Sequence, residues 1–570
     1  MPRGFSVELA ARCSLRDTYL ERRRKTRNPA HASRATGPVV RTNMTFRAHR
    51  LHSPASGRGG YLKKIHHSEV LAAIDVGTNA VRMELARPLP DGSLETLHQE
   101  RDPVRPGEGV FATGSIPREV ADRLMSTLRR YGALCRRDGA RLRAVATSAV
   151  REARNGAEIV RRARAEAGIE LEVVSGREEA RLICLGVLHG KPPHVRSLVV
   201  DIGGGSTEVA LANGENPVDL WSVAVGAVRL TEMFGISAKV PAGRLALVRS
   251  YSAEAFREGL PKPFRHPSVA LGSSGTINAV VGFAASNRRS ATAKEISKAV
   301  EELARMRIEE RRRHFDPKRA EIVVGGAVIL EAAVSHMGLS SVTSVDTGLR
   351  NGLLLDLLRR GTSQPEDRSG VEAALALGRR FDFDERHAIQ VGAMAVTLFE
   401  DLANLHGLPL AARRALEAAA LLHDVGNAVS FHKHHKHTFY LVANADMPGF
   451  SNREREIVAT VARYHRRSTP DRNRADLAQL SAAELTTVRK LAALLRVANA
   501  LDASHQQPVR ELRAEQRDGV VTLRLRLRGP ADLELWDADR EGQFFREVFR
   551  KRLEFAVRRS GARSRRRLSS

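Results

Sequence analysis

The sequence is poor in the residues that build disulfide or zinc-stapled scaffolds. It contains three cysteines, Cys13, Cys135 and Cys184, and none is spaced as C-x-x-C. An odd, sparse set of this kind indicates a reducing compartment and argues against a disulfide framework or structural zinc. Residues 1–69 contain no apolar core of a secretory signal, and no run approaches the ~20 apolar residues that a membrane-spanning helix needs. We therefore expect a cytoplasmic protein with no membrane association.

Aromatic and acidic side chains are also scarce. Aromatic residues make up 5% of the chain and are not interleaved with basic ones, which argues against stacking on single-stranded nucleic acid. Lysine and arginine number 92 against 65 aspartates and glutamates, which gives a formal charge of +27. Residues 1–69 hold fifteen basic and four acidic residues, and the basic tail 557–570 adds six arginines. The rest of the chain is still basic, which suits a polyanionic partner, whereas nucleic acid would bind only non-specifically through the tails.

The basic N-terminal stretch has two interpretations. Its composition favours a disordered extension over residues 1–69, or a start placed too early, with Met44 as an internal alternative. An arginine-rich, acid-poor leader is also typical of organellar transit peptides.

From residue 70 onward, strand and helix patterns alternate and predict two α/β lobes, over residues 70–180 and 181–360. A polar, proline-containing stretch at 361–367 is the best linker candidate. Residues 365–505 are rich in alanine and leucine and predict an all-helical domain. Residues 506–556 then predict a small α+β unit.

Two glycine-rich turns, each led by an aspartate, stand out in the lobes. The first contains Asp75, Gly77, Thr78 and Asn79, and the second contains Asp201, Gly203, Gly204, Gly205, Ser206 and Thr207. Glycines let backbone N–H groups approach an anion, hydroxyls donate to phosphate oxygens, and a carboxylate can hold a divalent cation or orient water. Two copies of this turn predict two related lobes that face one phosphate site.

A third turn and two absent motifs narrow this interpretation. The third turn contains Gly272, Ser273, Ser274, Gly275 and Thr276 and runs into a helix. No G-x-x-x-x-G-K-[ST] motif occurs, which excludes a P-loop NTPase, and the aspartate turns lead into strands rather than helices, against a dinucleotide-binding fold. An ordinary glycine-rich hairpin remains the alternative for either turn taken alone.

Two charged side chains lie between the aspartate turns. Arg151 directly follows a predicted strand, where a guanidinium can reach a cleft and clamp a phosphate, although a surface arginine at a helix start is the plainer interpretation. Glu179 lies in the first turn of a helix opened by a Ser175–Glu178 capping box, where the helix dipole favours the ionised carboxylate. From the residues alone, capping is the favoured role for either glutamate of the Glu178–Glu179 pair.

These motifs resemble the exopolyphosphatase/guanosine pentaphosphatase family. The matching stretches are AAIDVGTNAVRMEL (72–85), ATSAVREARN (146–155), SGREEARLICLGV (175–187), LVVDIGGGSTEVAL (198–211), VAVGAVRLTEMF (223–234) and LGSSGTINAV (271–280). Several long motifs in the same order make the resemblance specific over residues 70–355, and residues 380–505 extend it into a helical domain. The resemblance implies a duplicated actin–hexokinase–Hsp70-type α/β fold, followed by an all-α HD-like domain and the small C-terminal unit.

The resemblance also implies roles for individual residues. Glu179 falls on the family's catalytic carboxylate, proposed as the general base that activates water, and Arg151 falls on its phosphate-contacting arginine. Asp201 and Glu208 fall on carboxylates linked to a divalent cation, Mg²⁺ or another. Asp75 and the other residues of the three turns fall on substrate-binding positions.

The implied reaction is metal-assisted hydrolysis of the terminal phosphoanhydride of inorganic polyphosphate. The same site in this family converts guanosine pentaphosphate to the tetraphosphate, so that substrate stays open. Two other classes also stay open: a kinase, which would need an adenosine pocket near residues 272–276, and a polyphosphate- or nucleic-acid-binding scaffold. A homodimer is implied by the resemblance alone.

Two positions depart from the family pattern. The third turn reads GSSGT where a double glycine before the threonine is commoner, and Asn351 stands where a glutamate is usual. Neither position falls on the base or on the cation-linked carboxylates, so we expect an effect on fine geometry rather than on the reaction class.

A second constellation lies in the helical domain and resembles the HD superfamily. Its candidate metal ligands are His387, His423, Asp424 and Asp502. Histidines and aspartates in this pattern can bind one divalent ion, but Asn499 stands where HD hydrolases supply the final aspartate, which would weaken a hard-cation site. The histidine-rich segment 432–437 and His465 could bind phosphate or metal. We favour a polyphosphate-contacting surface here over a catalytic metal.

Overall fold

The computed structural model describes residues 69–559 except 91, 262–266, 362–368, 467, 473 and 475–476. The predicted basic extension, most of the linker candidate and most of the basic tail lie outside the described residues.

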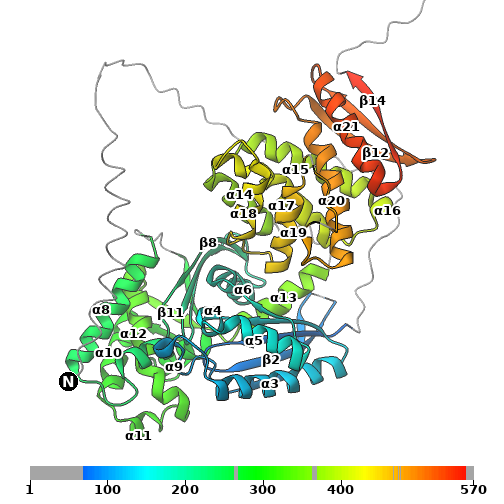
Figure 1. The fold of residues 1–570 in the computed structure, drawn as a ribbon. Coiled ribbons are helices and arrows are strands. Elements are labelled where there is room, and N and C mark those ends of the chain that lie inside the picture. Colours follow the sequence, from blue (N-terminus) through cyan, green and yellow to red (C-terminus); the bar gives the residue numbers. More distant parts are fainter. Residues whose placement is uncertain are drawn as a thin grey trace, which may run out of the picture. The chain divides into compact units, whose positions relative to one another are not determined.

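The first lobe is built on a five-stranded sheet in the order β3-β2-β1-β4-β5 (Figure 1). Its strands are β1 (Leu71–Val76), β2 (Val81–Pro88), β3 (Leu94–Asp102), β4 (Arg141–Ala146) and β5 (Leu171–Val173). Strands β1, β2 and β3 pair antiparallel, and β4 pairs parallel with both β1 and β5. Strand β1 is buried along its whole length, as expected for the apolar run at the centre of a sheet covered on both faces.

The second lobe repeats this topology. Its sheet has the order β10-β11-β9-β6-β7-β8, in which β6, β7 and β8 pair antiparallel and β6, β9 and β11 are parallel. The strands are β6 (Arg196–Ile202), β7 (Thr207–Asn213), β8 (Asn216–Val223), β9 (Val269–Ser273), β10 (Ser290–Thr292) and β11 (Ser341–Ser344). Because β8-β7-β6-β9-β11 has the same strand order as the first sheet, the structure is compatible with the predicted duplicated fold.

Helices cover both faces of each sheet. In the first lobe they are α2 (Val110–Thr113), α3 (Arg118–Arg137), α4 (Ser148–Glu152), α5 (Gly156–Arg162), the π-helical turn η1 (Ala163–Ala167) and α6 (Gly176–Leu188). In the second lobe they are α7 (Ala227–Phe234), α8 (Ala242–Gly259), α9 (Ser274–Ala284), α10 (Ala293–Arg305), α11 (Ile308–Arg311), α12 (Pro317–Met337) and α13 (Leu349–Gly361).

Helix α13 joins the two lobes. It lies in the predicted second lobe, yet Leu353 and Leu357 pack with Leu71 and Ala73 of β1. The alternate residues of β1, Ala72 among them, face the opposite side and share a core with α3. Helix α6, inside which the predicted lobe boundary between residues 180 and 181 falls, packs on the second sheet. Its Leu182 also packs with Leu71 of β1. Helices α6 and α13 therefore both connect the two lobes.

The described residues between the linker and residue 500 contain helices and no strand. Its helices are α14 (Ser369–Arg380), α15 (Glu385–Asp401), α16 (Ala403–His406), α17 (Ala411–Leu422), the 3-10 turn η2 (Val425–Ala428), α18 (His434–Ala443), α19 (Asn452–Arg463) and α20 (Ala482–Ala500). A three-stranded sheet follows, made of β12 (Val509–Arg517), β13 (Val520–Leu527) and β14 (Arg552–Arg559), with α21 (Asp532–Phe549) packed on it. The sheet and the helices share one hydrophobic core, so the small α+β unit is continuous with the helical domain.

Helix α12 departs from the sequence expectation. By length and composition it is long and apolar enough to cross a membrane, whereas the sequence analysis expected no such run. However, 78% of its most apolar window is buried, and its valines and isoleucines lie in the core of the second lobe. That burial is typical of a core helix.

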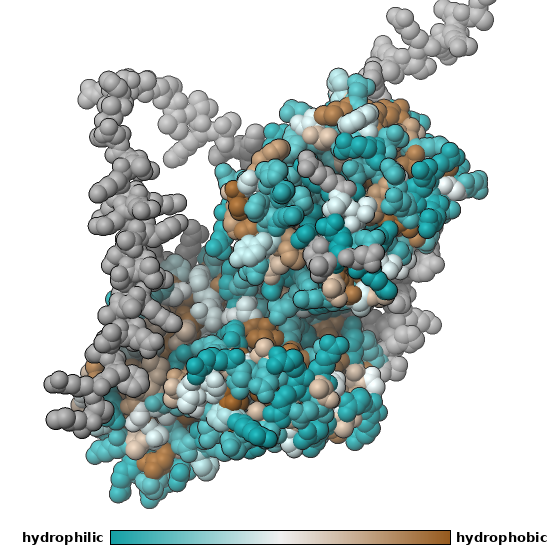
Figure 2. Space-filling model, viewed as in Figure 1, coloured by the Kyte–Doolittle hydropathy of each residue, from teal (hydrophilic) through white to brown (hydrophobic). Residues whose placement is uncertain are grey.

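The surface in view in Figure 2 is mostly hydrophilic, with apolar residues in separate patches. Individual exposed apolar side chains include Phe431, Tyr440 and Trp536. The predicted homodimer stays a prediction.

Candidate functional site

The two aspartate turns have the same backbone geometry and meet at one cleft. In each turn the first glycine donates its N–H to a carbonyl three residues later, from Gly77 to Ala80 at 3.1 Å and from Gly203 to Ser206 at 3.0 Å. The turns also touch, because a methyl group added at Gly204 would lie only 2.7 Å from the Cβ of Thr78. Glycine at that position therefore lets the lobes approach closely.

The cleft has a volume of about 200 Å³ and gathers most of the predicted site residues. Those that line it are Asp75, Gly77, Thr78, Asn79, Glu179, Asp201, Gly203, Gly204, Gly205, Ser206, Ser273, Ser274, Gly275 and Thr276. Arg151, Thr207, Glu208 and Gly272 do not line it. The Thr207 hydroxyl is buried and donates to the carbonyl of Val225 at 2.7 Å, so it has a structural partner instead.

The cross-strand neighbours of the two aspartates differ in charge. Asp75 faces Arg82 across β1 and β2, and the Arg82 Nη1 lies 3.3 Å from the Asp75 Oδ2. Asp201 faces Glu208 across β6 and β7, which places two acids opposite each other. Like charges in such a pair are destabilising unless a cation lies between or beside them. The two turns are therefore alike in backbone and unlike in electrostatics.

Four carboxylates lie together at this point; Asp75, Glu179 and Glu208 are buried and Asp201 is half-buried. Burial raises the pKa of Glu179 to about 7 and that of Asp201 to about 6, and the nearby Asp75 contributes to both shifts. Burial also raises the pKa of Glu208 well above its usual range, with further repulsion from Glu179 and Asp201. This result is opposite to the expectation that the helix dipole would keep Glu179 readily ionised, because burial outweighs the dipole.

The donor set fits a divalent cation. The Asp75 Oδ1 and the Glu208 Oε2 are buried without a hydrogen-bond partner, and the other Glu208 oxygen accepts from the Ser222 hydroxyl at 2.8 Å. Within the described residues, three or more ligand atoms lie within 4.8 Å of one another only in the helical domain, so no three of these carboxylates are that close together. Mg²⁺ commonly binds one or two carboxylates and completes its shell with water and phosphate oxygens, which suits that spacing.

The structure separates the adjacent glutamates by their partners. Glu178 accepts from Arg181 Nε at 2.7 Å, and Asp356 accepts from Arg143 and Arg181 at 2.6 and 2.5 Å. Burial opposes ionisation of Glu178, but the Arg181 and Arg143 guanidiniums lower its pKa overall. Ser175 caps the backbone N–H of Glu178, but the Glu178 side chain is committed to this network. The predicted capping box is therefore only half formed, and Glu178 is structural.

Glu179 instead points into the cleft and pairs with Arg151. The Arg151 Nη1 donates to the Glu179 Oε2 at 3.0 Å and to the Val174 carbonyl at 2.9 Å. Arg151 itself lies outside the cleft lining, so its contact with the cleft runs through Glu179. In this arrangement Arg151 positions the Glu179 carboxylate and partly offsets the pKa increase that burial causes.

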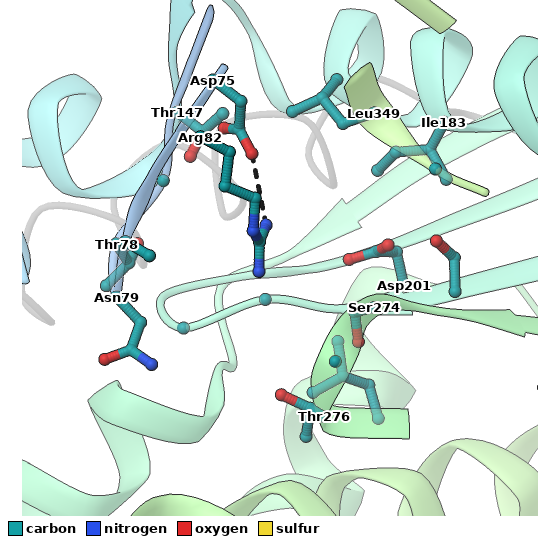
Figure 3. A pocket seen from close by; sticks show the side chains of 18 of the residues that line it. Asp75, Thr78, Asn79, Arg82, Thr147, Ile183, Asp201, Ser274, Thr276 and Leu349 are labelled. Carbon is teal, nitrogen blue, oxygen red and sulfur yellow. Dashed lines mark hydrogen bonds and ion pairs between the residues drawn. The ribbon is translucent and has the colours of Figure 1, made fainter. Parts of the chain in front are cut away.

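Three arginines that the sequence reasoning did not single out supply the positive side of the cleft. Arg82, Arg319 and Arg350 all line it, and Figure 3 shows Arg82 and Asp201 reaching into it from opposite lobes. Burial lowers the pKa of Arg319 to about 10, and the Arg319 Nη1 donates to the Thr276 hydroxyl at 3.0 Å. Arg82 lies in the stretch 72–85, which carries part of the family resemblance. Nothing local in the sequence links Arg319 or Arg350 to the turns.

In the helical domain the candidate ligands form a second polar cluster. His387 and His423 approach each other, with their Nε2 atoms 3.2 Å apart, and the His387 Nδ1 lies 2.8 Å from the Asp502 Oδ2. Asp502 is thus the acid that lies beside His387, and the weakening expected from Asn499 stays a prediction. His434 and His465, both in the segments singled out by sequence, join Asp424.

Two models of one protein family match this chain. Residues 89–361 match the model of the Ppx/GppA phosphatase family, and residues 371–534 match the Ppx/GppA phosphatase domain III. Among solved structures, the Aquifex aeolicus member of the Ppx/GppA family is 24% identical, with a TM-score of 0.45, over 52% of this chain and 99% of its own. An exopolyphosphatase from Cytophaga hutchinsonii is 24% identical, with a TM-score of 0.46, over 51% of this chain and 98% of its own. The two family matches cover Glu179, the second aspartate turn and the helical domain, and the first match begins after the first aspartate turn. The chain belongs to the Ppx/GppA phosphatase family.

Proposed function

We propose that this chain is an exopolyphosphatase, which hydrolyses the terminal phosphoanhydride of inorganic polyphosphate and releases orthophosphate. The observation that carries the proposal is a buried glutamate, Glu179, with its pKa raised to about 7, in a cleft that also contains two phosphate-type turns. A carboxylate with a pKa near the working pH combines the correct protonation state with useful basicity.

The chemistry of this chain's own residues follows from the cleft. The Glu179 carboxylate accepts a proton from water, and the water oxygen attacks the terminal phosphorus while the bond to the bridging oxygen breaks. Backbone N–H groups and hydroxyls of the turns, together with Arg82 and Arg319, hold the phosphate oxygens in place and balance their charge. Arg151 keeps Glu179 oriented toward the cleft.

Mg²⁺ is the cofactor we propose, held by Asp201 and Glu208. The like-charged cross-strand pair and the unpartnered Glu208 oxygen support this assignment. When bound, the ion would neutralise charge on the carboxylates and on the phosphate oxygens.

The lining of the cleft favours polyphosphate over guanosine pentaphosphate. Among the described residues, those that line the cleft include no aromatic side chain on which a guanine could stack, whereas three arginines are present. Repeating phosphate groups need charge along their path rather than a base pocket. Guanosine pentaphosphate remains the alternative substrate for the same site.

The test compares phosphate release from long-chain polyphosphate and from guanosine pentaphosphate by the full chain, with Mg²⁺ and after chelation. We expect a higher kcat/KM for polyphosphate and loss of release without the cation. The Glu179→Gln variant should lose release from both substrates.

Glu534→Gln provides the matched control, because Glu534 is also buried, accepts from the Ser504 N–H at 3.0 Å and lies in α21, outside the cleft lining. A higher kcat/KM for guanosine pentaphosphate would favour the alternative substrate. Phosphate transfer from ATP to an added acceptor would instead identify a kinase. Tight polyphosphate binding without any turnover would identify a scaffold.

A further inference from the structure

A second cavity lies beside the cleft. Its volume is about 410 Å³, and it is lined by residues of α4 and α6 from the first lobe and of β8 from the second. Arg151, which does not line the cleft, lines this cavity instead. The chemistry proposed for the cleft gives the second cavity no role.

The two cavities share a wall. Ser206 lines both of them. Arg151 lines the second cavity, and its Nη1 donates to the Oε2 of Glu179, which lines the cleft, at 3.0 Å. Ser222 also lines the second cavity, and its hydroxyl donates to Glu208 at 2.8 Å. The proposed base and one proposed cation ligand are therefore each one hydrogen bond away from the second cavity.

The charges of the second cavity suit a small anion. Its lining contains the acids Glu152 and Asp446, but Glu152 is paired with Arg229, whose Nη2 lies 2.6 Å from each carboxylate oxygen. After this pairing, the lining holds two guanidiniums, of Arg151 and Arg177, and one remaining carboxylate. A small positive excess of this kind attracts an anion that has to leave again.

Arg151 links the two cavities. It bonds both to Glu179 and to the Val174 carbonyl through Nη1, at 3.0 and 2.9 Å. Because a guanidinium carries five N–H donors in a planar fork, Arg151 can hold Glu179 through one nitrogen and present other donors to an anion. Its side chain is 22% exposed, which leaves it accessible from the second cavity.

The hydrolysis itself defines two sides of the terminal phosphorus. Attack is roughly in line with the bond that breaks, so the water lies opposite the bridging oxygen and the rest of the polyphosphate chain. Glu179 accepts the proton of that water and therefore marks the water side, where Arg151 joins it to the second cavity. Orthophosphate forms between this wall and the shortened polymer. To leave through the cleft, it would have to wait until the polymer left first.

We propose that the second cavity admits the attacking water and receives the orthophosphate product on its way out, an inference that rests on the polyphosphatase function proposed above. After accepting a proton, Glu179 is neutral and no longer binds Arg151 by charge. The guanidinium then donates to the orthophosphate, since its bonds to phosphate are charge-assisted. Orthophosphate passes into the second cavity, Glu179 returns its proton to solvent water, and Arg151 pairs with Glu179 again. The shortened polymer stays in the cleft.

Product inhibition distinguishes this route from exit through the cleft. Orthophosphate bound in the second cavity does not compete with the polymer, so its inhibition should be noncompetitive with polyphosphate. Arg177→Ser should raise the Ki of orthophosphate several-fold, because one of the two guanidiniums in the lining is lost. Competitive inhibition in the unmodified chain, or an unchanged Ki in this variant, would overturn the proposal.

A bulky side chain in the second cavity tests the exit directly. Ala224 is exposed and lines this cavity but not the cleft, so Ala224→Phe should obstruct the route and leave the shared wall intact. Val218→Phe is the matched control, since Val218 is also exposed, lies on β8 and lines neither cavity. Circular dichroism checks that both variants are folded.

Two phosphate measurements locate the slowed step. Acid quenching gives the total orthophosphate formed, and a fluorescent phosphate sensor gives the orthophosphate that is free. In the unmodified chain and in Val218→Phe the two should rise together. In Ala224→Phe the total should exceed the free amount by up to one phosphate per chain, and kcat should fall several-fold. In H₂¹⁸O, this variant should release phosphate with more than one ¹⁸O, because retained orthophosphate can re-form the anhydride and be hydrolysed again.

Three results with Ala224→Phe would contradict the exit. An unchanged kcat would show that the second cavity is not on the route. Total and free orthophosphate that fall together would show that the substitution slows the chemical step instead. A raised KM for polyphosphate would show that the polymer, rather than the product, passes through this cavity.

A binding measurement separates this inference from the function on which it rests. Trp221 lines the second cavity, and Trp536 is the other tryptophan of the chain. In the Trp536→Phe variant, inorganic phosphate should change the fluorescence of Trp221, and adding Ala224→Phe should abolish the change. This response in a chain that does not hydrolyse polyphosphate would refute the proposed function and leave a phosphate site. Turnover without this response would refute the site and leave the function.

Discussion

The replacement of Glu179 by glutamine should lower catalytic activity and raise stability at high pH, and the pKa of Glu179 sets the size of the stability change. Folding raises the pKa of Glu179 from 4.5 to about 7, mainly through burial. The folded chain therefore holds a proton on Glu179 between pH 4.5 and about 7 that the unfolded chain has released. The free energy of unfolding must fall as the pH rises through that window, and it stays lower above pH 7.

The size of the loss follows from the two pKa values. It amounts to about 3 kcal/mol, taken as an upper limit because neighbouring carboxylates titrate with Glu179. Glutamine resembles the protonated glutamic acid in shape and charge. The Glu179→Gln variant should therefore match the unmodified chain in thermal stability at pH 4.5 and melt several degrees higher at pH 8.5, without Mg²⁺. Saturating Mg²⁺ should narrow the difference at pH 8.5, since the cation neutralises the carboxylates.

The same substitution should lower the rate of phosphate release, although it raises the melting temperature at pH 8.5. Loss of a general base costs roughly 10²–10⁴-fold in kcat. In the unmodified chain, kcat/KM should rise with pH to a plateau above about 7, because the carboxylate must be ionised to accept the proton. Melting curves at both pH values and steady-state phosphate release give the two readouts. A variant that keeps more than a tenth of the turnover, or that melts below the unmodified chain at pH 8.5, would refute the reasoning.

Three further substitutions test other parts of the cleft. Glu208→Gln should raise the Mg²⁺ concentration needed for half-maximal phosphate release by roughly 10–100-fold, because one of two opposed carboxylates loses its charge; an unchanged Mg²⁺ requirement would argue against a cation at this pair. Arg319→Met should raise KM for polyphosphate more than it lowers kcat, as expected for a side chain that binds phosphate and takes no part in the reaction. Steady-state kinetics with polyphosphate of two chain lengths measures the changes in KM and kcat separately. Gly226→Ala should destabilise the chain by about 1–3 kcal/mol and lower kcat, since the added methyl would collide with the Gly204 carbonyl and the Gly205 N–H. Thermal melting and phosphate release check both effects. Normal melting with a normal kcat would show that the second turn tolerates displacement.

Local patterns predicted the elements that carry the site. Gly77 and Gly203 each close a turn between two strands, as the strand–turn–strand pattern indicated, and Ser175 caps the helix that presents Glu179. Such features depend on a few consecutive residues, which is why they can be found from sequence. Arg319 could not be found this way, because it enters the cleft from a helix more than a hundred residues after the second turn.

The electrostatic state of the cleft could not be predicted locally either. The helix dipole favours an ionised Glu179, but the structure buries it beside three other carboxylates, and burial decides its pKa. The same reason separates it from Glu178, whose partner Arg143 comes from β4. The sequence does not show which residue packs on which.

Backbone preference and the spacing of apolar residues along the chain are enough to predict the two aspartate turns, the order of motifs and the alternation of strands and helices. Which charged side chains lie next to one another depends on the tertiary structure. It placed Arg82 opposite Asp75 and Glu208 opposite Asp201, so that the two similar turns have different electrostatic surroundings. It also gathered histidines that are far apart in the sequence into close pairs. Both outcomes depend on distances between residues far apart in the chain, and Coulombic and ligand interactions respond to those distances rather than to sequence separation.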